Sequence, residues 1–394
     1  MHRLSQSPTD PAFVQNPYPF YHRARATGPL FYWEDYGMTA AVSHAAVQAI
    51  LRDRRFGRAV PAELAEPVPD HLAPFYAIDD HSMLELEPPA HTRLRNLVLR
   101  AFTSRRIAAL GPEIEALATR LAQALPEGDT DLLPAFATPL PVIVIARLLG
   151  VPEDMAPDLL RWSNTMVAMY QARRNRQIED AAARAATEFS DYLRSYIDSR
   201  RRRPANDLIT ELIAAEEDGE RLSTDEMIAT CVLLLNAGHE ATVHTIGNGV
   251  AALLSSGLDP LDATAPDAID TTVEEILRYD PPLHMFTRWA YEEVQLDGHT
   301  FRRGDQVALL LGAANRDPEV WADPDRFDPT RPARPNASFG GGLHFCIGAP
   351  LARLELRMAL PALFRSCPTL RLTETPRYAD SYHFHGLERL MLRR

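Results

Sequence analysis

Apolar residues recur at helical spacing through most of the chain, and this pattern predicts a mainly helical protein. The longest predicted helix covers residues 223–254 and opens with Ser223 and Glu226, spaced as a capping box. It would span about 48 Å at a rise of 1.5 Å per residue, so its middle must cross the interior. Further helices are expected at residues 16–25, 43–51, 93–102, 112–125, 155–172, 174–203 and 349–364.

Strand patterns occur towards the two ends of the chain. Residues 30–42 are rich in aromatic residues, and residues 294–311 alternate like paired strands with a turn at Asp297–Gly298. Residues 61–74 are rich in proline and are expected to form a long loop that acts as a lid. No linker separates two folding units, so the expected architecture is mainly α with small β-sheets (α+β), as a single domain over residues 1–394.

Composition limits the class of protein. The hydrophobic content of 46% and the charged content of 24% are those of an ordinary globular protein, and the net charge of −12 argues against nucleic acid as a partner. No apolar run reaches the roughly 18–20 residues of a membrane span, and the polar N-terminus lacks a signal-peptide core. The three cysteines have no zinc-motif spacing, and their odd number fits a reducing cytoplasm. We therefore expect a cytoplasmic protein without membrane attachment.

The segment 339–348 reads FGGGLHFCIG and carries the strongest chemical signal. Its three successive glycines let the backbone turn tightly and approach a flat ligand closely. Cys346 lies beyond them, just before a predicted helix whose N-terminus favours the thiolate form. The alternative, taken alone, is a glycine loop with a buried and inert cysteine.

This segment resembles the haem-binding loop of the cytochrome P450 family, and the resemblance runs from about residue 16 to the end of the chain. It implies the helix-rich P450 fold, haem b as cofactor and Cys346 as the iron ligand, with Phe339 and Gly348 in the cofactor-binding loop. A thiolate ligand supplies electron density that assists O–O cleavage.

Two further motifs match the family. Glu275 and Arg278 match its Glu-x-x-Arg helix, about 70 residues before Cys346, and Arg331 resembles the third member of that buried ion cluster. The implied role of the cluster is structural, because it holds the cysteine loop. The family resemblance also implies that four cationic residues bind the haem propionates: His91, Arg95, Arg288 and His344. Each of these, taken singly, is better explained as an exposed cation.

A polar turn interrupts the apolar centre of the long predicted helix. The resemblance places it above the iron, where Ala237 and Gly238 leave room for dioxygen and Glu240 relays protons. The family usually has threonine directly after the acid, whereas this chain has Ala241 there and Thr242 one position later. One residue on a helix is a rotation of about 100°, so Thr242 points elsewhere. A substrate hydroxyl, an ordered water or a helix distortion would compensate.

The resemblance also suggests a mainly apolar substrate pocket. The expected contacts are Phe75, Leu233, Leu234, Ala237, Met285, Phe286 and Phe384, with Asn236, His284 and His385 as polar members. Ordinary core packing is an equally good explanation for each of them. None of these residues specifies a substrate.

The expected function is a haem-thiolate monooxygenase that inserts one atom of O2 into a small or medium, mainly apolar organic molecule. Electrons would come from a separate ferredoxin or flavodoxin-like protein, which Arg100, Arg105, Arg353 and Arg357 are placed to meet. Two alternatives stay open, namely a peroxide-driven enzyme of the same fold and a haem-binding protein without catalysis. Retention of Glu240 argues against the peroxide-driven enzyme.

Overall fold

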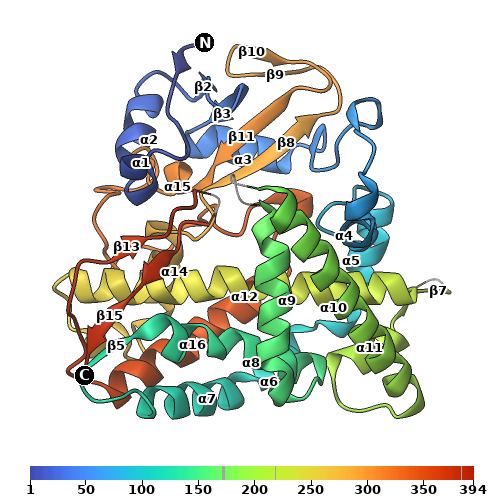
Figure 1. Ribbon diagram of the computed structural model, residues 1–394. Helices are drawn as coiled ribbons and strands as arrows, with labels where there is room; N and C mark the ends of the chain where they lie inside the picture. The colour runs from blue at the N-terminus through green and yellow to red at the C-terminus, as the bar shows by residue number, and fades with distance from the viewer. Residues whose placement is uncertain (171–173, 218, 383) are drawn as a thin grey trace.

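The long helix α12 (Thr224–Ser255) crosses the whole molecule (Figure 1). The structure is a computed structural model and describes residues 1–170, 174–217, 219–382 and 384–394. The predicted capping box is present, because the Ser223 hydroxyl accepts from the Glu226 amide at 3.1 Å and the Glu226 carboxylate accepts from the Ser223 amide at 2.8 Å. Cys231 and Leu235 in the centre of α12 are fully buried, so this helix forms the axis of the core.

Helices surround α12 on several sides. Those that contact it are α4 (Ala73–Asp79), α8 (Pro139–Leu149), α9 (Ala156–Val167), α10 (Arg176–Arg202), α11 (Leu208–Ala214), α13 (Pro260–Ala263), α14 (Ile269–Tyr279) and α16 (Ala349–Ser366). The remaining helices are α1 (Pro11–Gln15), α2 (Tyr18–Arg25), α3 (His44–Arg52), α5 (Ala90–Ala101), α6 (Ser104–Ala109), α7 (Gly111–Gln123) and α15 (Leu311–Ala314). Helix α7 packs along α16 below α12 in Figure 1.

A six-stranded sheet packs at the N-terminal end of the molecule, at the top of Figure 1. Its strand order is β1 (Arg3–Leu4), β2 (Leu30–Trp33), β3 (Met38–Ala41), β11 (Gln306–Leu310), β8 (Met285–Ala290) and β4 (Phe56–Gly57). Strands β3 and β11 pair in parallel, with Thr39 opposite Val307. The sheet therefore joins segments from the two ends of the chain.

Four small sheets complete the strand content. They are the hairpin of β9 (Val294–Leu296) and β10 (His299–Phe301), the hairpin of β6 (Glu216–Glu217) and β7 (Glu220–Arg221), the pair of β13 (Arg377–Tyr378) and β14 (Leu387–Arg389), and the sheet of β12 (Arg371–Leu372), β15 (Met391–Arg393) and β5 (Asp129–Asp131). Asp297 and Gly298 have φ of 48° and 74°, so the predicted turn between β9 and β10 is confirmed.

Some local expectations were wrong. Helix α8 was not predicted; it starts at Pro139 and includes Pro141, and proline is tolerated in the first helical turn. The expected loop 61–74 contains two short 3-10 turns and ends in α4, which includes Pro74. The expected helix 155–172 ends at Val167, with a 3-10 turn to Tyr170, and Ala172 lies outside the described residues.

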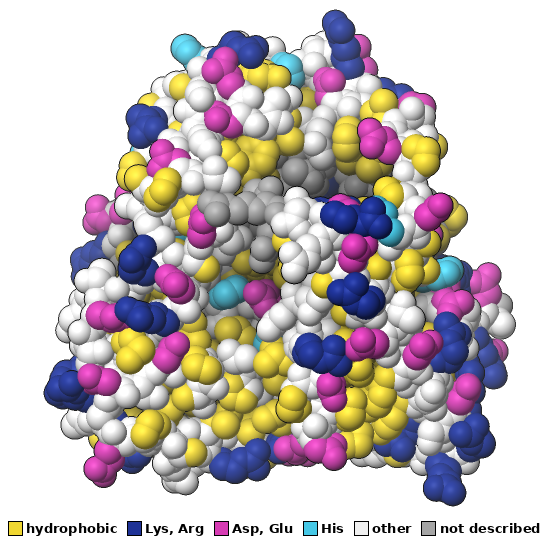
Figure 2. All heavy atoms as spheres, in the orientation of Figure 1, with side chains coloured by type: hydrophobic (Ala, Val, Ile, Leu, Met, Phe, Trp, Pro, Cys, Tyr) yellow, Lys and Arg dark blue, Asp and Glu magenta, His cyan; other side chains and the backbone are white. Residues whose placement is uncertain are grey.

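Charged side chains of both signs are interspersed over the face shown in Figure 2. Within the part of the chain that the structure describes, no helix combines the length and the apolar character that crossing a membrane requires.

Candidate active site

A cavity of about 320 Å³ lies between α12 and the segment that leads into α16. Ala237, Gly238, Ala241 and Thr242 of α12 line one wall, and Cys346 lies on the other. The cysteine loop and the polar turn of α12, far apart in the sequence, are thus brought to one space.

Backbone geometry fixes the loop before Cys346. Gly340 and Gly342 have φ of 69° and 65°, a region that favours glycine, and a Cβ on Gly342 would collide with the backbone of Leu51 in α3. The amide of Cys346 donates to the carbonyl of Phe339 at 3.0 Å and closes the loop. Cys346 follows the 3-10 turn of residues 342–344, and two residues separate it from the start of α16 at Ala349.

Burial raises the pKa of the Cys346 thiol, while the amides of Gly348 and Ala349 and the charges of Arg95 and Arg353 act in the opposite direction. The amides belong to the N-terminal end of α16, which favours negative charge on the sulfur. A metal ion at this sulfur would displace its proton outright. The loop thus presents a single sulfur ligand to the cavity.

The four cationic residues predicted from the sequence all line the cavity. Arg288 is 3% exposed, and burial lowers its pKa to about 10, with Arg58 adding to the effect. Its guanidinium donates to the carbonyl of Thr287 at 2.8 Å, and no ion pair with a carboxylate is found for it among the described residues. His91 is fully buried, and neither of its ring nitrogens has a hydrogen-bond partner.

Arg95 and His344 also have partners in the protein. Arg95 donates to the carbonyl of Phe345 at 2.8 Å, and the Nε2 atom of His344 lies 3.0 Å from Glu87. Burial lowers the pKa of His91 to about 4, with His344 and Arg95 adding to the effect.

These groups fit a haem. Buried cations and unpartnered imidazole nitrogens need anionic or polar partners, and two propionate carboxylates would satisfy them. The sulfur of Cys346, which lines the same cavity, would hold the haem iron as a thiolate ligand.

The predicted ion cluster is assembled next to the loop. Arg278 donates to both carboxylate oxygens of Glu275 at 2.7 and 2.8 Å, and Arg331 lies 3.4 Å from the same carboxylate. Glu275 and Arg278 are only 4% and 2% exposed. Arg278 also donates to the carbonyls of Asn315 and Pro324, so it ties α14 to the segment before the cysteine loop.

Glu240 does not line the cavity. Its carboxylate lies 3.1 Å from Nε2 of His244, one turn further along α12. Burial raises the pKa of Glu240, but the hydrogen bond and charge of His244 outweigh it, and the net direction is downwards. Helix α12 is α-helical throughout its length, so no distortion turns Thr242 towards the position of Ala241.

Sequence reasoning missed a second acid. Glu355 of α16 lines the cavity, is 2% exposed, and its Oε1 atom has no hydrogen-bond partner. Burial raises its pKa to about 8, against a hydrogen bond with Thr242 that lowers it. The signal was available, because Glu355 falls on the apolar face of α16 between Leu351 and Ala359.

Most residues expected in the substrate pocket line the cavity: Phe75, Leu233, Leu234, Ala237, Phe286 and Phe384, together with Asn236. Met285 does not, because successive side chains of β8 point to opposite faces and Met285 packs against the N-terminal aromatic cluster. His284 and His385 lie behind the cavity wall, fully buried. Ile145 and Leu148 of the unpredicted α8 add to the apolar wall.

Comparisons with known proteins agree with this geometry. A family model described as cytochrome P450 matches residues 268–377. The cytochrome P450 monooxygenase PikC of Streptomyces venezuelae is 40% identical over 382 residues, covering 92% of this chain and 87% of PikC. The polyketide biosynthesis cytochrome P450 PksS of Bacillus subtilis is 36% identical over 405 residues, covering 99% and 98%.

Among solved structures, P450BioI in complex with an acyl carrier protein ligated to hexadec-9Z-enoic acid superposes with a TM-score of 0.90 at 36% identity, covering 97% of this chain and 99% of that one. The P450 fold and the mainly helical class expected from the sequence are thus confirmed. The chain belongs to the cytochrome P450 family and is a monooxygenase with haem b as its cofactor.

Proposed function

We propose that this enzyme inserts one oxygen atom from O2 into a small or medium-sized, mainly apolar organic substrate, in the cytoplasm, with electrons from a separate ferredoxin-type protein. The observation that carries the proposal is the cavity itself. It joins the Cys346 sulfur to a wall of apolar side chains beside the Ala237–Thr242 turn of α12. Haem bound at this sulfur supplies the oxygen-activating chemistry.

The walls support an apolar substrate. Phe75, Leu233 and Phe286 are apolar, and Asn236 and Asp79 are among the polar residues of the lining. A pocket of this kind binds by apolar burial and orients its ligand by few polar contacts. The ligand named for P450BioI, a hexadecenoic acid on a carrier protein, is an apolar chain of the proposed kind.

Proton delivery is assigned to Glu355 and Thr242. Thr242 lines the cavity and is hydrogen-bonded to Glu355, whose raised pKa keeps the carboxyl protonated at neutral pH. The hydroxyl missing at Ala241 would then be replaced by a substrate hydroxyl or a water in contact with Thr242. Glu240, paired with His244, belongs to the same turn of α12 but does not line the cavity.

The electron donor is proposed from the family and from arginines near the cysteine loop. Arg353 and Arg357 are ion-paired with Glu274 and Asp270, so they have acidic partners within the chain. Arg105 in α6 is exposed and is retained as a docking residue for an acidic partner.

The test is reconstitution of the purified protein with a ferredoxin, its reductase and NADPH under 18O2, over a panel of apolar substrates. The proposal expects the reduced, carbon monoxide-bound protein to show the red-shifted absorption of thiolate-ligated haem, and one 18O atom in the product. Turnover with hydrogen peroxide alone, and none with the ferredoxin system, would establish the peroxide-driven alternative. Substrate binding without any product in either system would establish a haem-binding protein.

A further inference from the structure

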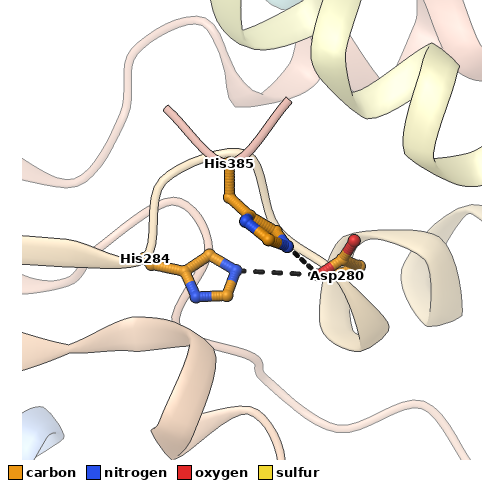
Figure 3. A group of neighbouring side chains, drawn as sticks. All are labelled: Asp280, His284 and His385. Carbon is orange, nitrogen blue, oxygen red and sulfur yellow. Dashed lines mark ion pairs between the residues drawn. The ribbon is translucent and has the colours of Figure 1, made fainter. Parts of the chain in front are cut away.

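Three side chains outside the haem cavity meet in the interior behind its wall. Asp280 follows the end of α14, His284 precedes β8, and His385 comes from the C-terminal segment (Figure 3). Each offers one ligand atom, and these atoms lie within 4.8 Å of one another. The three residues are 5%, 0% and 1% exposed.

The separations are wrong for hydrogen bonds and suitable for a shared metal ion. The Nε2 atoms of His284 and His385 lie 3.6 and 3.5 Å from the same carboxylate oxygen, Oδ1 of Asp280. A nitrogen–oxygen hydrogen bond is normally no longer than about 3.2 Å. Ligand atoms about 2.0–2.1 Å from a tetrahedral zinc ion lie about 3.3–3.4 Å apart. Nε2 of His284 has no hydrogen-bond partner among the described residues.

The surrounding groups orient the three ligands. Nδ1 of His284 lies 2.9 Å from the hydroxyl of Tyr21, which leaves Nε2 to face Asp280. The Asp280 carboxylate accepts a hydrogen bond from Tyr18 on Oδ1, at 2.7 Å, and one from Tyr378 on Oδ2. Contacts such as those of Tyr21 and Tyr378, which leave the facing atom of the ligand free, fix ligand orientation in metal sites.

The ring of His385 is also held in place. It stacks on Tyr378, with ring centroids 3.7 Å apart and an interplanar angle of 13°. The side-chain amide of Asn248, from α12, donates to the carbonyls of both Asp280 and His385, at 3.2 and 2.9 Å. The backbone therefore brings two of the ligands together independently of any ion.

Burial and the neighbouring charges act on all three side chains. Burial lowers the pKa of His385 to about 3 and also lowers that of His284, although Asp280 acts against both shifts. Burial raises the pKa of Asp280, but His385, His284 and Arg316 outweigh it, and the net direction is downwards.

One fixed cation lies beside the cluster. Arg316 stacks on the ring of Tyr18, donates to the carbonyl of Tyr279 at 2.8 Å, and lies 3.3 Å from Asp325. Its positive charge opposes the binding of a divalent cation, and the ion pair with Asp325 partly offsets that charge.

We propose that Asp280, His284 and His385 bind a divalent first-row metal ion of the Zn²⁺ class, in a structural site separate from the haem. The ion would join the end of α14, the start of β8 and the C-terminal segment. Leu283 and Phe384, the residues next to the two histidines, pair in a β-bridge, and both line the haem cavity. The bound ion would therefore hold this part of the substrate-pocket wall rigid.

The experiment uses the haem-loaded protein, purified without a histidine tag, treated with a chelator and then equilibrated with Zn²⁺. We expect one zinc per haem iron by elemental analysis, with a Kd of about 1 µM or tighter. Zinc-edge X-ray absorption should show two imidazole nitrogens and no sulfur. Asp280→Asn and His385→Gln should weaken zinc binding about 100-fold or more. His2→Ala, which removes an exposed histidine, should leave it unchanged.

Two results would overturn the site. One is wild-type protein that takes up no stoichiometric zinc, or takes it up with sulfur ligation. The other is unchanged zinc affinity in Asp280→Asn or His385→Gln protein that retains its haem. If both variants fail to fold, the absorption spectrum of the wild-type protein decides alone. These readouts do not involve turnover, so they are independent of the proposed reaction.

Discussion

Replacing Glu355 by glutamine tests the proton pathway directly. Burial moves the pKa of this carboxyl from an ordinary 4.5 to about 8. At about 1.4 kcal/mol per pKa unit, this difference means that the fold favours the neutral acid by about 5 kcal/mol. A pKa above 7 means that Glu355 holds its proton at neutral pH, next to the hydroxyl of Thr242.

Glutamine keeps the shape of the side chain and removes the proton that it can give. Positioned acids typically contribute about 10²–10⁴-fold to a proton-transfer step. We expect Glu355→Gln to lower O2-supported turnover about 100-fold, the low end of that range, because Glu240 and a substrate hydroxyl remain available. Turnover driven by hydrogen peroxide should be almost unchanged, since peroxide brings its own protons.

The pH dependence gives a second readout. Wild-type O2-supported turnover should fall as the pH rises through about 8, because Glu355 loses its proton, and the variant should lack this limb. The folded-state pKa is raised, so the stabilising contribution of the neutral acid is complete below the ordinary value of 4.5 and is lost as the pH rises through about 8. Urea unfolding between pH 5 and 9 should therefore show a decline that Glu355→Gln removes.

The matched control is Glu115→Gln on the neighbouring helix α7, where the glutamate is exposed and paired with Arg365. It should change none of these quantities. Full O2-supported turnover in Glu355→Gln, with normal haem content, would refute the assignment. An equal loss with O2 and with peroxide would show that the substitution damages the site as a whole.

Three further substitutions have specific expected outcomes. Arg288→Leu should weaken haem retention about 10- to 100-fold, measured by haem transfer to apomyoglobin, because one charge-assisted contact to a propionate is worth about 1.5–3 kcal/mol; retention equal to wild type would contradict the propionate role. Glu275→Gln should lower the free energy of unfolding by about 3–5 kcal/mol, measured in urea, because Arg278 is left buried without its counter-charge. A loss under 1 kcal/mol, well below that range, would show that this ion pair contributes little to stability. Ala241→Thr should increase product formed per NADPH for substrates without a hydroxyl group, and unchanged coupling would show that the missing hydroxyl is not limiting.

Local signals predicted the helical part of the fold well. The capping box at Ser223 and the helical spacing that follows it describe α12 to within one residue at either end. Helix α8 was missed at its proline-rich start. Pro139 and Pro141 lie in its first turn, where proline costs little, so they are compatible with a helix. The pairing of β3 with β11 could not be predicted, since it joins segments more than 260 residues apart.

The features of the site that depend on local sequence were predicted, and those that depend on the packing of distant elements were not. The spacing around Cys346 is local, and so the loop was found from the sequence. The position of Glu355 against Thr242 depends on how α16 crosses α12, which no local pattern records. Met285 was wrongly assigned to the pocket because the sequence does not give the register of β8. The face of the sheet on which a strand residue lies is known only once its pairing with the neighbouring strand is known.

Contacts from the short helix α14 fix the cysteine loop in position without a covalent cross-link. Its Leu277 carbonyl accepts from the hydroxyl of Ser338 at 2.5 Å, at the start of the loop. Its Glu274 carboxylate accepts from Arg353 just beyond the loop, at 2.5 and 3.1 Å. Arg353 also lies 4.6 Å from the centre of the Phe339 ring, inside the loop. One rigid helix thus fixes the segments on both sides of the sulfur, and the position of Cys346 follows from them.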